Sequence, residues 1–433
     1  MAKKLWEKGI ETDAFIEAFT VGRDREFDLE LAGYDVQGTI AHITMLEKVG
    51  LLEKSELKKL VVELNSIAQV IEKGDFVIEE GVEDVHSQIE MMLVRSLGDV
   101  GKKVHSGRSR NDQILVDLKL FFRAEIQSLA SYAKKLFDTM LELSGEKNDV
   151  LLPGYTHTQA AMPSSFGMWF AAYAESLVDD LVLMQSVHTI VNQNPLGSAA
   201  GYGSSFPLDR EHTTELLNFE GPTVNVVYAQ MGRGKVEQIL AFAMAALAGT
   251  LNKLAADICL YNSQNFNFIE LPDELTTGSS IMPHKKNPDV FELIRAKTNQ
   301  IKALPNSVAM ATTNLTSGYH RDFQILKELI FPAIKELKNC LLITEYAISK
   351  LEVNPNILDD PKYQLIFSVE AVNEMVLQGT PFRDAYLLVA KHIKEGTFTP
   401  PKELKHTHLG SIGNLANAQI KDRMEETFAK FKQ

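Results

Sequence analysis

Apolar residues recur at three- and four-residue spacing along two long stretches, residues 115–143 and 240–258, and strand-like alternation is nearly absent. This spacing places the apolar side chains on one face of an α-helix. Helices of this length exceed the globular average and favour a bundle packed at shallow angles. The pattern therefore predicts an all-α fold around a long central helix bundle.

Two further helices are predicted, one over about 163–191 and one starting with Asn287 as its N-cap and Pro288 as its first residue. The stretch around 240–258 is apolar or small on most faces, which indicates burial in a core or between subunits. Its most apolar run, 239–251, is too short to cross a bilayer, so we expect no membrane partner.

A chain of 433 residues is expected to form two or three domains. We predict an N-terminal helical domain over 1–105, a central long-helix bundle over 106–355 and a small C-terminal helical domain over 356–433. The second boundary follows the turn residues Asn354-Pro355-Asn356.

The net charge of −13 argues against nucleic acid or a membrane surface as partner, because phosphates require a dominant basic face. Cys259 and Cys340 lie in apolar helical sequence and are predicted to be buried, reduced thiols. The charged N-terminus lacks the apolar region of a signal peptide, which predicts a cytoplasmic protein.

Four loops have a composition that is unusual for connectors. Residues 105–112 (His-Ser-Gly-Arg-Ser-Arg-Asn-Asp) could clamp a carboxylate or simply cap the following helix, and the two readings weigh equally. His157, between hydroxyls in 153–159, could be an acid or base, although a structural histidine is the commoner case. Residues 319–327 carry polar groups that by themselves would pass for a helix face.

The signature loop, which we define as residues 276–288, is the strongest candidate. It combines Gly278 and two serines with Lys285 and Lys286 ahead of a helix, and Glu292 follows. Donors and positive charge at a helix N-terminus can stabilise a developing carbanion or carboxylate dianion. A lysine-decorated surface loop is the alternative, which the presence of the other loops disfavours.

The string Gly-Ser-Ser-x-Met-Pro-x-Lys-x-Asn-Pro at 278–288 resembles the signature of the fumarase/aspartase superfamily. Loops 105–113 and 319–327 resemble the argininosuccinate lyase family within it. So do shorter islands at 35–38, 83–86, 153–157, 195–197 and 381–385, which follow the family order over nearly the whole chain.

The resemblance implies a homotetramer with active sites built by loops of three subunits and with no metal or organic cofactor. It implies reversible cleavage of argininosuccinate to arginine and fumarate in arginine biosynthesis. Ser279 would be the base, Lys285 would stabilise the dianion, and His157, oriented by Glu292, would protonate the leaving nitrogen. The division of acid and base between His157 and Ser279 stays open. The residues implied in substrate binding are Arg110, Asn111, Thr156, Asn287, Tyr319, Gln324, Lys327 and, near the site, His86.

The chain departs from the family pattern at several positions. A serine expected near the start is replaced around Arg23-Asp24, Met231-Gly-Arg-Gly234 stands for Ser-Asp-Arg-Asp, and His284 replaces a glutamine. Two alternatives follow: a related fumarate-releasing lyase such as adenylosuccinate lyase, or a non-catalytic structural protein like δ-crystallin. The intact set Ser279, Lys285, His157 and Glu292 argues against the structural role.

Overall fold

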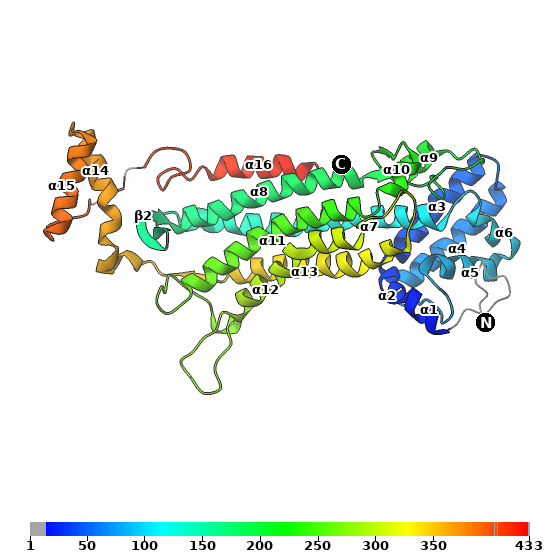
Figure 1. Cartoon of the computed structure of the whole chain (residues 1–433), viewed down its shortest axis with the longest axis horizontal. Coiled ribbons are helices and arrows are strands. Elements are labelled where there is room, and N and C mark those ends of the chain that lie inside the picture. Colours follow the sequence, from blue (N-terminus) through cyan, green and yellow to red (C-terminus); the bar gives the residue numbers. More distant parts are fainter. Residues whose placement is uncertain (1–13, 402, 405, 432–433) are drawn as a thin grey trace. The chain divides into compact units, whose positions relative to one another are not determined.

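The computed structural model describes residues 14–401, 403–404 and 406–431, and helices make up most of this part of the chain (Figure 1). The all-α prediction is confirmed. The strands in the described residues form three two-stranded sheets: β1 (Leu151–Thr156) with β2 (Gln159–Ser165), β3 (Gln193–Asn194) with β4 (Gly221–Pro222), and β5 (Ile269–Glu270) with β6 (Glu352–Val353).

The chain divides into two compact units that interleave along the sequence. The first comprises the described residues up to 129 together with 184–245 and 301–335, and the second comprises 130–183, 246–300 and the described residues from 336 onward. The three-domain division at 105 and 355 stays a prediction. Five long helices supply residues to both units: α7 (Arg110–Glu146), α8 (Phe166–Val191), α11 (Lys235–Tyr261), α12 (Asp289–Ala311) and α13 (Ile325–Ile348).

The long helices confirm the predicted stretches with two differences. Residues 163–165 belong to β2, so α8 begins at Phe166. Helix α12 begins at Asp289, because the Pro288 carbonyl accepts the Glu292 N–H (3.1 Å) and so takes the N-cap position. The backbone N–H of Asn287 instead donates to the Thr277 carbonyl at 2.9 Å. The predicted N-cap is therefore wrong by one residue.

Shorter helices fill the first unit: α1 (Ala14–Val21), α2 (Asp24–Asp28), α3 (Ala32–Lys48), α4 (Lys54–Glu72), α5 (Val85–Leu97), α6 (Asp99–Lys102), α9 (Arg210–Leu216) and α10 (Val226–Met231). The apolar faces of α3, α4 and α5 form one core, with Ile43, Leu60 and Leu93 fully buried. Burying each such side chain contributes about 1.5–3 kcal/mol. Gly38 lets α3 approach α7 closely, because a Cβ there would lie 3.1 Å from Val116.

The second unit contains the β1–β2 hairpin, α14 (Ser368–Leu377), α15 (Phe382–Lys394) and α16 (Asn417–Ala429). Aromatic rings on α8, on α11 and in the segment that follows α11 pack together: Trp169, Tyr261 and Phe268. Asp257 of α11 accepts hydrogen bonds from Trp169 and Tyr173 of α8. These contacts tie the two helices together within the unit.

Helix α11 is fully buried at positions such as Leu240, Met244 and Leu247, whereas Phe242 on the same helix is 55% exposed. By length and composition alone, it is the one described helix that could cross a membrane, but half of its apolar window is buried within the chain. A core helix of a soluble protein passes the same test. Both cysteines are free, as predicted, but only Cys340 is buried; the predicted burial of Cys259 is wrong, because its side chain is partly exposed.

Candidate active site

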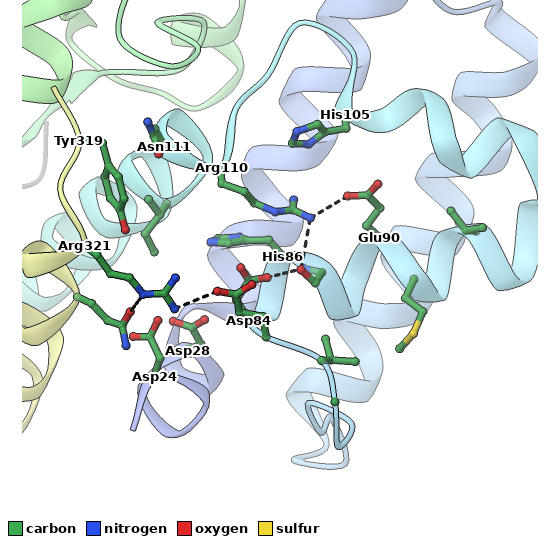
Figure 2. A pocket seen from close by; sticks show the side chains of 18 of the residues that line it. Asp24, Asp28, Asp84, His86, Glu90, His105, Arg110, Asn111, Tyr319 and Arg321 are labelled. Atoms are coloured by element: carbon green, nitrogen blue, oxygen red, sulfur yellow. Dashed lines mark hydrogen bonds and ion pairs between the residues drawn. The ribbon is translucent and has the colours of Figure 1, made fainter. Parts of the chain in front are cut away.

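A pocket of about 1250 Å³ lies within the first unit (Figure 2). Its wall comes from α2, the segment before α5, α5 itself, the first turns of α7 and the segment 319–327. Six of the predicted residues line it together: His86, Arg110, Asn111, Tyr319, Gln324 and Lys327. The sequence islands that carry these residues lie far apart along the chain, and the fold brings them to one cavity.

Arg110 is the first residue of α7, and its guanidinium group already has partners within the chain. One nitrogen lies 2.9 Å from Glu90 on α5, and another donates to Gln113 one turn along its own helix at 2.8 Å. Figure 2 shows Arg110 directed toward Glu90 across the pocket wall. Arg110 is therefore held rigidly before any ligand arrives, which reduces the entropy lost on binding.

His86, in the first turn of α5, is only 4% exposed, and its Nδ1 lies between two buried carboxyl groups. The distances are 3.1 Å to Asp35 and 3.5 Å to Asp117. Burial opposes the charge of Asp35, yet His86, Arg108 and a hydrogen bond from Gln113 lower its pKa to about 2. Because a carboxylate only accepts, Nδ1 of His86 carries the proton, and this fixes the ring.

The pKa of Asp117 is shifted in the opposite direction to that of Asp35. Burial, followed by the neighbouring charge of Asp35, raises the pKa of Asp117 well above its ordinary value. Both groups are fully buried, so one ionised and one protonated carboxyl group is the arrangement that two adjacent acids favour. Asp35, His86 and Asp117 also offer three ligand atoms within 4.8 Å of one another, as a metal ion would require.

Lys327, at the start of α13, is 4% exposed, and its Nζ lies 2.5 Å from both Asp24 and Asp28 of α2. Burial opposes the charge on Lys327, but these carboxylates raise its pKa. The sequence marked position 24 as a departure but did not identify either aspartate as a partner of Lys327.

Gln324 and Tyr319 have different surroundings in the same segment. The Gln324 amide donates to the carbonyls of Thr20 and Val21 at 3.0 Å, which fastens the end of α1. Tyr319 is 42% exposed, and its ring lies 6.2 Å from Phe323. Arg321, between them, pairs with Glu83 at 3.0 Å. The Tyr319 side chain therefore remains accessible from the pocket.

The signature loop belongs to the second unit and is largely exposed. The Ser279 hydroxyl accepts the backbone N–H of Met282 at 3.1 Å. Lys286 pairs with Glu270 and Asp273, whereas Lys285 has no ion-pair partner among the residues that the structure describes. The Asn287 amide donates to the Thr277 hydroxyl at 3.3 Å. Lys285 is therefore the loop lysine whose charge is left for a ligand.

His157 lies at the exposed tip of the β1–β2 hairpin, next to Thr156. Thr156 pairs with Gln159, so His157 and Thr158 form the two-residue turn, with φ of 51° and 59°. Two left-handed residues without a glycine cost about 1 kcal/mol or more each. Glu292, on α12, is exposed and lies 3.9 Å from Arg295. Within the described chain, no hydrogen bond joins His157 to Glu292.

The predicted residues thus fall into two groups. Ser279, His157, Lys285, Glu292, Thr156 and Asn287 belong to the second unit and do not line the pocket of the first. The pocket also contains residues that the sequence did not single out as ligands: Asp24, Asp28, Asp84, Glu90, His105 and Arg321. The individual roles of all the predicted residues stay predictions.

Comparisons with known proteins agree with this architecture. A family model described as lyase matches residues 7–302. The argininosuccinate lyase of Parabacteroides distasonis is 61% identical over 431 residues, covering 100% of this chain and 97% of the relative. That of Thermotoga neapolitana is 40% identical over 394 residues, covering 90% and 98%.

Solved structures share the fold at low sequence identity. An EDDS lyase in complex with formate has a TM-score of 0.76 at 21% identity and covers 98% of this chain and 91% of its own. A fumarate lyase:delta crystallin from Brucella melitensis, bound to cobalt, has a TM-score of 0.74 at 17% identity, with coverages of 98% and 96%. These two structures support the helical architecture of the chain.

Proposed function

Because the chain belongs to the argininosuccinate lyase family, we propose that it cleaves argininosuccinate reversibly to arginine and fumarate. The observation that carries this proposal is the 61% identity to an argininosuccinate lyase over the whole chain. The names of the relatives favour this substrate over adenylosuccinate and favour catalysis over a purely structural role.

The elimination removes a proton from a carbon beside a carboxylate, which is difficult unless the resulting dianion is stabilised. Lys285 is suited to this because its ammonium group is exposed and has no ion-pair partner among the described residues. The N-terminus of α12 follows the loop and adds partial positive charge. Ser279 takes the proton in this scheme, with Lys285 lowering the cost of its alkoxide form.

The second step is protonation of the departing guanidinium nitrogen. His157 is the proposed acid, and its position on a strained, two-residue turn fixes its backbone at an exposed tip. Glu292 would orient the imidazole. The pair does not form within the single described chain, so this role is assigned to residues that meet on assembly.

We further propose a homotetramer whose active sites combine residues of different subunits. Two observations support it. The pocket of the first unit lacks the proposed acid and base in its wall. Large apolar side chains are also exposed on helices of the bundle and on the signature loop, as at subunit interfaces: Val182, Phe242 and Ile281. The family resemblance and a net charge of −13 fit a cytoplasmic enzyme that binds a small molecule.

The test follows fumarate by ultraviolet absorbance with argininosuccinate, adenylosuccinate, aspartate and malate in parallel. We expect fumarate from argininosuccinate alone. Exchanging Ser279 for Ala should lower kcat by about 10²–10⁴-fold with unchanged folding, as loss of a general base does. Activity only with another of the substrates would overturn the substrate, and full activity of the Ser279→Ala variant would remove that serine from the base role. A monomer mass by light scattering would contradict the tetramer.

A further inference from the structure

One end of the pocket carries an excess of negative charge. Asp24 and Asp28 come from α2, and Asp84 directly precedes α5; we call these three residues the acidic corner (Figure 2). Lys327 is the cation that contacts it, at 2.5 Å from both Asp24 and Asp28. The Asp84 carboxylate accepts the Ser87 N–H at 2.7 Å, and within the described residues it forms no ion pair. Three carboxyl groups therefore face one ammonium group.

The other cations of the pocket wall form their ion pairs outside this corner, although, against the effect of burial, the charges of His86 and Arg110 act on Asp84 and lower its pKa. Arg110 lies 2.9 Å from Glu90, and Arg321 lies 3.0 Å from Glu83. The remaining pairs are Arg233 with Glu237, Arg95 with Glu79, and Lys102 with Asp99. Asp24 and Asp28 share the single ammonium group of Lys327, and partly buried carboxylates that are not fully compensated are costly, so this end of the pocket is complementary to a cation on the ligand.

We propose that the acidic corner, through Asp24, binds the α-ammonium group of the arginine half of the substrate. This inference rests on the proposed reaction and adds a specificity-determining residue to it. Asp24 is the member suited to direct contact, because its side chain is 18% exposed whereas that of Asp28 is 2% exposed. Asp28 and Lys327 hold Asp24 in place, because the Lys327 ammonium group lies 2.5 Å from both carboxylates.

The geometry fits the head of an α-amino acid, whose ammonium and carboxylate groups are attached to one carbon. Asp24 offers a carboxylate at 2.5 Å from the Lys327 ammonium, which has a third N–H beyond the two that serve the aspartates. The pocket therefore presents adjacent negative and positive groups to a zwitterion. The guanidinium of the substrate is the competing cation, but the proposed acid and base for bond cleavage there do not line this wall.

Asp24 also changes the recognition that the family resemblance implies. A serine, expected near this position, offers a neutral hydrogen bond, whereas a carboxylate offers a charge-assisted one of about twice the strength. A substrate without the ammonium group would desolvate Asp24 and leave it only the Lys327 ammonium group, which it shares with Asp28, as a partner. The pocket should therefore discriminate strongly against such a substrate.

The experiment compares argininosuccinate with its analogue in which hydrogen replaces the α-amino group, using the unaltered full chain, Asp24→Asn and Glu26→Gln. Glu26, also on α2, is exposed and pairs with Arg23, so it serves as the matched control. We expect Asp24→Asn to raise KM for argininosuccinate by about 10–100-fold, the loss of one charge-assisted contact. For the analogue, the same variant should change KM by less than about twofold, because the partner group is already absent. Glu26→Gln should leave both substrates unaffected.

An equal loss of activity toward both substrates would overturn the proposal and leave Asp24 only the role of holding Lys327. Thermal unfolding of each variant identifies a folding defect, and Asp24→Ser then provides a second, smaller replacement for the same comparison. If the unaltered protein releases no fumarate from argininosuccinate, the proposed function fails. In that case calorimetric titration with L-arginine and 5-guanidinopentanoate decides the inference. Preference for L-arginine that disappears in Asp24→Asn supports it, and equal affinity for the two compounds overturns it.

Discussion

The cations discussed in the pocket of the first unit are paired with carboxylates, whereas Lys285 in the signature loop of the second unit is not. In the pocket, Arg110, Arg321 and Lys327 are all held by carboxylates before a ligand binds. In the loop, Lys285 is exposed and has no ion-pair partner within the described chain, and Ser279 bonds only to backbone of its own loop.

The difference separates binding from chemistry. Groups that only position a substrate lose least entropy when they are already fixed. Groups that exchange protons or meet a developing charge need an unpaired state and a dry surrounding at the moment of reaction. The exposed loop lacks that surrounding in a single chain, which is consistent with the proposed assembly of the site between subunits.

The two adjacent lysines of the signature loop give the sharpest test of this contrast. Lys285→Ala should lower kcat by about 10²–10³-fold, because it removes the proposed stabiliser of the dianion. Lys286→Ala, which breaks exposed pairs with Glu270 and Asp273, should change kcat by about twofold or less. Steady-state kinetics with argininosuccinate measure both. Equal losses in the two variants would show that the loop needs positive charge in general and not a free lysine.

Lys327 should matter for stability as well as for substrate binding, in contrast to Lys285. Lys327→Met leaves Asp24 and Asp28 next to each other without a cation, and loss of one partner from a buried pair costs about 3–5 kcal/mol. Denaturant unfolding measures this. Combining Lys327→Met with Asp28→Asn should recover part of the loss, because fewer negative charges remain buried. A loss below about 1 kcal/mol would mean that the pair behaves like a surface salt bridge.

Asp24 should also give the pocket a pH dependence of its own. Burial, together with Asp28 and Asp84 and despite Lys327, raises the pKa of Asp24 from 3.8 to about 6. The carboxyl group is therefore protonated below about pH 6, and its attraction for an ammonium group is lost as the pH falls. We expect kcat/KM for argininosuccinate to fall by up to about tenfold per pH unit below pH 6. Profiles of the unaltered protein and Asp24→Asn test this, and an acid limb of the same pKa in both would assign it to another group.

The ionised form of Asp24 favours ligand binding but lowers the stability of the folded chain. The native Asp24 carboxyl holds its proton more strongly than the unfolded chain does, so its contribution to stability is present below pH 3.8. That contribution is lost as the pH rises toward about 6. The folded pocket therefore keeps an unfavourable charge at neutral pH, as functional sites often do.

The sequence predicted what depends on local pattern and left out what depends on long-range pairing. The stretches at 115–143 and 240–258 became α7 and α11 because helical periodicity is a local property. Asp28, one of the two partners of Lys327, lies 299 positions away along the chain, and nothing near Lys327 in the sequence points to it. The same holds for Asp35, which is 51 positions from His86. The β1–β2 turn went unrecognised because its two left-handed residues include no glycine or asparagine.

That turn supplies the smallest expected effect and the finest test of the contrast. Two-residue hairpin turns of this conformation favour glycine at the second position, where Thr158 has φ of 59°. Thr158→Gly should therefore stabilise the chain by about 0.5–1 kcal/mol, measured by denaturant unfolding. If the hairpin merely presents His157, kcat should stay unchanged. If the strained turn sets the direction of the His157 imidazole, the more stable variant should have a lower kcat. The proposed acid would then be held in place before the substrate binds, as Arg110 is in the pocket.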